Sequence, residues 1–296
     1  MAVYSKRQLL EQQEMITVVK ALTALTVLRL NKTYQTIRET KELLEKINAS
    51  IRRVFEIYPS NDPSYIRRKK QYMLKKQGAP QKTVMVFIAA NQDFYGDLIF
   101  EISRLFIADF KKAEADAVVI GKIGRAILAR EKIDSPRIRY FDLDDDRPDL
   151  RVVQEILEIL EGYDKVLVYH GKTESLLRQI PIRSEVLREI PDLVKPAKKY
   201  IFEPTADEVL DFLQVQTSIN SFHQRVYEAQ YARLAAKRWN WTKQQMARAR
   251  LLEELTHDFL KYKKSLLQKQ QQVTIFAHRQ NITENPNIKS TNVYGR

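Results

Sequence analysis

The chain has 296 residues, and 44% of them are hydrophobic, which is enough to form the core of one large domain or two small ones. It contains no cysteine, which excludes disulfides, thiol catalysis and cysteine-ligated zinc. The formal net charge of +13 permits binding to a nucleic acid, an acidic membrane surface or an acidic protein surface.

A long helix with a seven-residue repeat is predicted over the N-terminal part, residues 1–58. No Pro or Gly occurs in it before Pro59, so it would extend for roughly 80 Å. A repeat of seven keeps one seam facing a partner helix. The mostly apolar or threonine side chains of this seam fall in two series, Leu9, Ile16, Thr23, Leu30, Ile37, Leu44, Ile51 and Tyr58, and Gln12, Val19, Thr26, Thr33, Thr40, Ile47 and Val54.

Residues 59–82 are predicted to be a basic linker between this helix and the next domain. Pro59 and Pro80 bound it, and its positive side chains are Arg67, Arg68, Lys69, Lys70, Lys75 and Lys76. A solvated connection and a binding segment are equally compatible with such a cluster.

Strand and helix patterns alternate over residues 83–200, which predicts a small α/β domain. Strands are expected at 83–90, 117–120, 137–141 and 165–169, and helices at 97–112, 122–132 and 149–161. This alternation is typical of a parallel, Rossmann-like sheet with right-handed crossovers. Residues 177–186 could add an antiparallel strand, which Pro181 would place at an edge.

A second long helix is predicted over residues 201–277, and it would extend for about 105 Å from Thr205. Thr205 and Glu208 form a capping-box pattern at its start. Its apolar repeat comprises Leu252, Phe259, Leu266 and Val273, with Leu255, Tyr262 and Phe276 between them. The fold class is therefore α/β with an antiparallel coiled coil of the N- and C-terminal helices. The polar, Asn-rich residues 278–296 are expected to be a disordered tail.

No catalytic, cofactor-binding or metal-binding group of residues is predicted. The glycines at 121–125 lack the spacing and the hydroxyl of a phosphate-binding loop, and the loop at 91–97 carries two acids where a phosphate would lie. Four acids, Asp142, Asp144, Asp145 and Asp146, could bind a divalent cation, but acids that precede a helix more often cap it. His170 and the other histidines have no metal or triad spacing.

Four segments carry a family resemblance by their order and spacing. They read MITVVKALTAL at 15–25, ANQDFYG at 90–96, VYH at 168–170 with QIP at 179–181, and YIFEP at 200–204. They resemble the "ITKAMKMVA", "SDRGLCG", "VYN…Q.P" and "YLYEP" stretches of the gamma subunit of the F-type ATP synthases. The first is more similar still to the "SVVKTMKALAA" form of the sodium-type ATPase branch. Within the last helix, RLAAK at 233–237 and LLEELT at 251–256 lie where the family has "EHAAR" and "ELIKELT".

The resemblance implies a non-catalytic central stalk, or rotor. In the family the coiled coil fills the axis of a hexamer of alpha and beta subunits, the foot sits on the c-ring, and an epsilon subunit packs beside it. Expected hexamer contacts are Lys20, Arg29, Lys263 and Lys264. Expected contacts at the c-ring end are Tyr200, Phe202 and Glu203. The complex would lie on the cytoplasmic face of a bacterial inner membrane, with this chain as a peripheral subunit that has no cofactor and no span of its own.

The chain also departs from the family pattern. KKSLLQ at 263–268 replaces "RQASIT", and Arg233 replaces the Glu of "EHAAR". Two other classes of function stay open at this point. One is a nucleic-acid-binding protein with a basic coiled-coil arm, although acids alternate with the bases and RNA-binding motifs are lacking. The other is an enzyme on the α/β domain.

Overall fold

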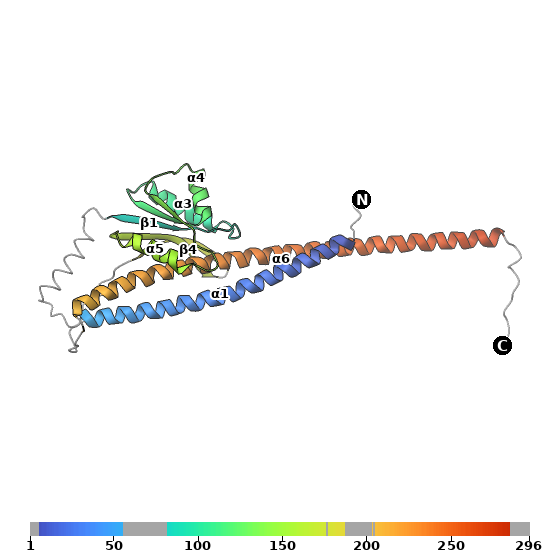
Figure 1. Ribbon diagram of the computed structural model, residues 1–296. Helices are drawn as coiled ribbons and strands as arrows, with labels where there is room; N and C mark the ends of the chain where they lie inside the picture. Colours follow the sequence, from blue (N-terminus) through green and yellow to red (C-terminus); the bar gives the residue numbers. More distant parts are fainter. Residues whose placement is uncertain (1–5, 56–81, 176, 187–202, 204, 285–296) are drawn as a thin grey trace. The chain divides into compact units, whose positions relative to one another are not determined.

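Along the chain, a long helix comes first, a domain with a five-stranded mixed sheet follows, and a second long helix comes last (Figure 1). The computed structural model describes residues 6–55, 82–175, 177–186, 203 and 205–284. The elements are α1 (Lys6–Phe55), β1 (Thr83–Ile88), α3 (Leu98–Phe110), β2 (Asp116–Ile120), α4 (Lys122–Arg130), β3 (Ile138–Phe141), α5 (Leu150–Leu160), β4 (Lys165–Ser175), β5 (Arg178–Val186) and α6 (Ala206–Glu284).

The sheet has the strand order β3-β2-β1-β4-β5. The first four strands are parallel, and β5 pairs antiparallel with β4 along one edge. Strands β1 and β2 are buried on both faces, which explains their unbroken apolar sequences. Pro181 lies in β5, at the predicted edge of the sheet. Proline has no backbone N–H to donate, and the outer side of an edge strand has no partner strand that would require one.

Helices cover both faces of the sheet. On one face, α3 and α4 pack on Met85, Phe87 and Val119. On the other, α5 packs on Val84, Val86 and other strand residues. Helix α6 contributes to both clusters, through Phe222, Val226 and Ala229 to the second and through Ala232 and Ala236 to the first.

The chain divides into two compact units, one of residues 23–240 and one of residues 1–22 with 241–296. In the first, Leu30 of α1 packs with Leu234 of α6, and Ile51 of α1 packs with Leu210 of α6. A later residue of α1 therefore meets an earlier residue of α6, so the two helices are antiparallel. All predicted seam positions from Leu9 to Val54 are buried or half-buried, which confirms the seven-residue repeat of α1.

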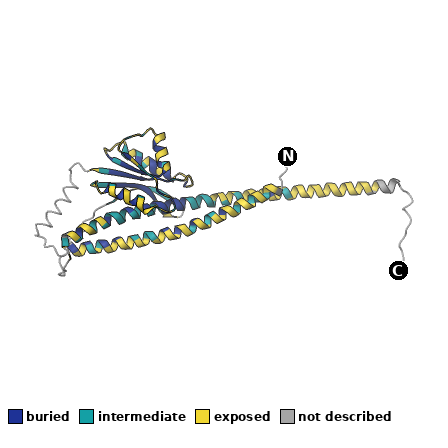
Figure 2. Ribbon diagram, in the orientation of Figure 1, coloured by how far each residue is buried: buried dark blue, intermediate teal, exposed yellow. Residues whose placement is uncertain are grey.

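In the second unit, Arg248 of α6 donates to Gln12 Oε1 of α1 at 3.2 Å. Lys6, where the described part of α1 begins, lies six residues before Gln12 and so falls opposite the residues just before Leu255. Leu255 is buried, whereas residues 260–277 are all exposed (Figure 2). No described helix is long and apolar enough to cross a membrane.

Three sequence-based predictions need correction or fall outside the described residues. The apolar repeat does not continue the coiled-coil seam beyond Phe259, because its members there are exposed: Tyr262, Leu266, Val273 and Phe276. Helix α6 runs to Glu284, so residues 278–284 do not belong to the predicted disordered tail. The basic linker, apart from its last residue, lies outside the described residues, as do 187–202, 204 and the rest of the tail.

Candidate functional site

Helix α6 lies against the carboxyl ends of β1 and β4. In a doubly wound sheet of this order, the strand order reverses between these two strands, and ligands usually bind outside them. Gly171 of β4 is so close to α6 that a Cβ atom there would lie 3.1 Å from Cβ of Ala232 and 3.1 Å from Leu98 Cδ2. Protein atoms therefore occupy the position at which such a sheet usually binds a ligand.

Arg233 anchors α6 at this edge. Its side chain is almost fully buried, and Nη1 donates to the carbonyl oxygen of Ala89, which follows β1, at 2.5 Å. Its Nε lies 3.9 Å from Oδ1 of Asp145, which follows β3. The sequence showed Arg233 as a departure from the family pattern, and the structure gives that residue a buried partner on the sheet.

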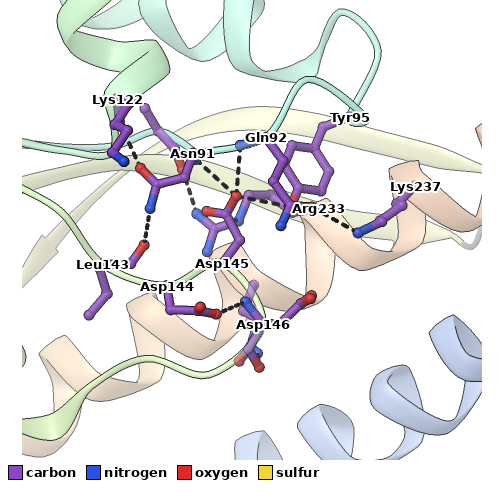
Figure 3. Close-up of polar contacts among 12 residues, drawn as sticks. Asn91, Gln92, Tyr95, Lys122, Leu143, Asp144, Asp145, Asp146, Arg233 and Lys237 are labelled. Atoms are coloured by element: carbon purple, nitrogen blue, oxygen red, sulfur yellow. Dashed lines mark hydrogen bonds and ion pairs between the residues drawn. The ribbon is translucent and has the colours of Figure 1, made fainter.

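Asp145 binds the loop that follows β1 (Figure 3). Its Oδ2 accepts hydrogen bonds from the backbone N–H groups of Asn91 at 2.8 Å and Gln92 at 3.0 Å, and from the Tyr95 hydroxyl at 3.1 Å. Burial, and next the negative charge of Asp145, raise the pKa of Tyr95 above its usual value. Asp145 is itself buried, and these donors together with Arg233 compensate for its loss of hydration.

Asp146 connects both long helices to the sheet. Its carboxylate Oδ2 accepts a hydrogen bond from Arg29 of α1, with which it forms an ion pair. Its backbone carbonyl oxygen accepts a hydrogen bond from Gln230 of α6 at 2.7 Å. The side chain of Asp144 accepts from the backbone N–H groups of Asp146 and Arg147, both at 2.8 Å, and so fixes the turn. We call Asp145, Asp146, Arg29, Gln230 and Arg233 the polar junction.

Two further side chains of α6 bind the loop after β1. Lys237 donates to Gln92 Oε1 at 3.0 Å, and its ammonium lies 5.7 Å from the centre of the Phe94 ring. Asn240 donates to the Phe94 carbonyl oxygen at 3.1 Å. Polar contacts from Gln230 to Asn240 thus hold three turns of α6 against the two loops.

His170 forms a second buried contact between the sheet and α6. Its Nε2 lies 3.0 Å from Ser184 Oγ on β5 and 3.9 Å from a carboxylate oxygen of Glu228 on α6. Burial lowers the pKa of His170 to about 4, although Glu228 acts in the opposite direction. The imidazole is therefore neutral near pH 7 and fills the interface between strand and helix.

Most acids of the β3–α5 loop are engaged in protein contacts, as their position before a helix favoured, whereas Asp142 is exposed. Asp149 caps α5 by accepting from the Arg151 backbone N–H at 2.9 Å, while Asp144 and Asp145 bind other N–H groups. Among the residues that the structure describes, no three His, Cys, Asp or Glu side chains could jointly hold a metal ion. The arrangement joins elements of the fold to one another.

Comparison with known proteins identifies the family. A family model described as ATP synthase, that of the gamma subunit, matches residues 5–274. The chain belongs to the ATP synthase gamma-subunit family. It is therefore a non-catalytic central-stalk subunit of the complex, a rotor, and neither nucleic-acid binding nor catalysis on the α/β domain is favoured.

Solved structures show the same fold at low sequence identity. The rotor of the Euglena gracilis mitochondrial ATP synthase matches with a TM-score of 0.56 and 13% identity, over 88% of this chain and 97% of that one. The central stalk and c-ring structure of the Tetrahymena thermophila mitochondrial ATP synthase matches with a TM-score of 0.53 and 12% identity, over 76% and 98%. No curated protein sequence matches this gamma-family chain.

The structure places the expected contact residues of this gamma-family chain in different surroundings. Lys20, Lys263 and Lys264 are exposed on the long helices. Arg29 forms an ion pair with Asp146, and 46% of its side chain is exposed. Glu203 is exposed, whereas Tyr200 and Phe202 lie outside the described residues.

Sequence reasoning did not find the polar junction. Asp145 and Asp146 were recognised as acids near a helix, but their partners Arg29, Gln230 and Arg233 lie far away in the sequence. One signal was present, since a charged residue at position 233, inside an otherwise small and apolar stretch of α6, needs a buried partner.

Proposed function

We propose that this gamma-family rotor turns inside a hexamer of alpha and beta subunits and couples ion flow through a c-ring to ATP synthesis or hydrolysis. The observation that carries the proposal is the family match over residues 5–274, together with two unbroken helices, α1 and α6. A shaft that transmits torque must resist bending, and helices without internal Pro or Gly provide that stiffness.

The end of α6 is the proposed contact with the hexamer. Residues 260–277 are exposed, and residues 259–283 contain no Asp or Glu. Within residues 260–277 the exposed bases are Lys261, Lys263, Lys264 and Lys269, and they alternate with exposed apolar side chains such as Leu266, Leu267 and Phe276. A basic and apolar surface suits a sleeve that is partly acidic. We assign Lys263, Lys264 and, on α1, Lys20 to this contact.

The residues just before α6 are proposed to contact the c-ring. Tyr200, Phe202 and Glu203 precede α6 within the segment that resembles the family's "YLYEP" stretch. The Tetrahymena thermophila match is a structure of a central stalk with its c-ring, which supports such a partner. An epsilon subunit is proposed to pack beside the sheet domain, and the complex to lie on the cytoplasmic face of a bacterial inner membrane.

Rotation would act through differential contact. Two helices and one sheet domain have no threefold symmetry, so each of the three alpha–beta pairs would meet a different surface of the rotor. A ligand or partner shifts a conformational equilibrium by as much as its affinities for the two states differ. A turning, asymmetric rotor would therefore bias the nucleotide sites one after another.

Co-purification tests the proposal. The full chain is expressed with an affinity tag in its own host, and the bound proteins are identified and quantified by mass spectrometry. We expect nucleotide-binding alpha and beta subunits at three copies each per tagged chain, with ATPase activity in the eluate. Recovery of the chain without them, or with nucleic acid in a salt-dependent complex, would overturn the proposal.

A further inference from the structure

The β3–α5 loop carries two adjacent carboxylates that bind different parts of the molecule (Figure 3). Asp145 is buried and joins the loop after β1 to Arg233 of α6. Asp146 joins Arg29 of α1 through its side chain and Gln230 of α6 through its backbone. One short loop thus contacts both long helices and the centre of the sheet.

The two contacts differ in burial. In the Asp145–Arg233 pair, 1% and 5% of the side chains are exposed, whereas in the Asp146–Arg29 pair the exposed fractions are 19% and 46%. Removing one partner of a fully buried pair leaves an uncompensated charge and damages the fold, while a half-exposed partner such as Arg29 can be removed at a smaller cost. At Asp146, which is 19% exposed, the change to Asn keeps the size and polarity of the side chain and removes only its charge.

The neighbouring contacts of α6 do not replace the Asp146 contact. Lys237 and Asn240 hold α6 to the loop after β1, and His170 faces Glu228 of α6. All of these contacts act on α6. Arg29 belongs to α1, so its ion pair joins the sheet domain to the other helix of the coiled coil.

We propose that Asp145 and Asp146 are positioning residues that fix the sheet domain to both long helices, so that torque passes between the domain and the coiled coil without slip. The inference rests on the proposed rotor function. If the ion pair of Asp146 with Arg29 is lost, the sheet domain keeps its attachment to α6 and loses one to α1, so the domain is displaced relative to α1 when the rotor works against a load.

The test uses the assembled complex in vesicles. ATP hydrolysis and ATP-driven ion uptake are measured on the same preparation, with a pH indicator and a sodium indicator in parallel. The variants are Asp146→Asn, Arg29→Gln and both together. Asp142→Asn is the matched control, since it makes the same chemical change at an exposed acid of the same loop.

We expect Asp146→Asn and Arg29→Gln each to lower the ions taken up per ATP by about two-fold or more, with the hydrolysis rate and the thermal midpoint unchanged. The double variant should lower the ratio no further, because each single change already removes the same interaction. The charge exchange Arg29→Glu with Asp146→Lys should restore part of it. Asp142→Asn should match the unsubstituted complex.

Three outcomes decide the matter. A normal ratio in both single variants would overturn this inference and leave the rotor function intact. Equal loss in Asp142→Asn would also overturn it, because the effect would then follow from loop charge alone. If the unsubstituted chain does not assemble with nucleotide-binding subunits, the proposed function itself is wrong.

Discussion

At the scale of single residues, buried polar groups determine where α6 lies on the sheet. Apolar packing against Ala229, Ala232 and Ala236 would tolerate small shifts along the helix, since these side chains are similar in size and shape. The buried pair of Arg233 and Asp145 does not tolerate such shifts, because a shifted helix would leave two buried charges without partners. The pair therefore contributes more to a unique position than to net stability.

The close approach at Gly171 gives the first prediction. In Gly171→Ala the new Cβ would lie 3.1 Å from both Ala232 and Leu98, so we expect a loss of about 1–3 kcal/mol in the free energy of unfolding from overpacking. Urea unfolding measures it. Gly162→Ala is the control, since its Cβ would meet nothing closer than the Ile159 carbonyl oxygen at 3.6 Å. Similar values for the two variants would contradict the close contact.

His170 gives the second prediction, on pH dependence. Burial lowers its pKa in the folded chain to about 4, while Glu228 raises it and Arg225 and Lys172 lower it. The unfolded chain, with a pKa of about 6.5, binds more protons between these values, so stability is complete above about pH 6.5 and is lost as the pH falls towards 4. The loss is about 2 kcal/mol at pH 5.

The measurement compares the unsubstituted chain with His170→Gln. Urea unfolding at pH 7.5 and pH 5 should show the larger decrease in the unsubstituted chain. Other groups titrate in both proteins, including the half-buried His223, whose pKa burial also lowers, so the difference isolates His170. Equal decreases in the two proteins would show that His170 is not held neutral by burial.

At the scale of elements, α6 passes through three environments along one continuous helix. Near its start it pairs with α1, residues 229–236 are buried except for Tyr231, and residues 260–277 are exposed. A helix buried all round needs small or apolar side chains, and the central stretch supplies four alanines and a leucine, together with the paired Arg233. The exposed stretch keeps apolar residues at helical spacing without a partner within the described residues.

The third prediction follows from the end of the coiled coil. Leu255→Ala and Leu266→Ala are the same chemical change at positions that are 9% and 41% exposed. We expect the first to lower the free energy of unfolding by about 2 kcal/mol and the second to leave it nearly unchanged in the isolated chain. Urea unfolding followed by circular dichroism measures both. A comparable loss in Leu266→Ala would mean that the exposed stretch is packed within the chain.

For the molecule as a whole, the positive charge indicates which kinds of partner the chain can bind. The excess of +13 is carried in part by the acid-free end of α6, where nothing in the described residues neutralises Lys263 and Lys264. Charges of this kind change association rates and salt dependence more than they change the fold. The proposed contact of the end of α6 with alpha and beta subunits would give such a surface a use.

The fourth prediction tests that use. Lys263→Glu with Lys264→Glu should weaken binding of the rotor to alpha and beta subunits by about tenfold at low salt and flatten its salt dependence. Reconstitution of the complex at two ionic strengths measures the effect. Lys111→Glu with Lys112→Glu, which reverses two exposed adjacent charges after α3, is the control. If both double variants behave alike, the effect follows from net charge and the contact is elsewhere.

Much of the fold was predictable because its signals are local. The repeat of seven in α1, the unbroken apolar runs of β1 and β2, and Pro181 at an edge are read within a few residues of each other. The end of the coiled coil was not predictable in this way. The repeat continues to Phe276, but its members after Phe259 are exposed, and a repeat does not indicate whether a partner helix lies opposite.

Periodicity and short segments in a fixed order are enough to predict the two long helices, the alternating sheet domain and the family. The polar junction, in contrast, depends on how the elements pack in three dimensions. Asp146 pairs with Arg29, and Asp145 pairs with Arg233, across sequence separations of roughly 90 to 120 residues. No local sequence pattern predicts which of the four acids pairs with which base. The folded sheet and the antiparallel helices decide the pairing, because they bring these groups together at one edge of the sheet.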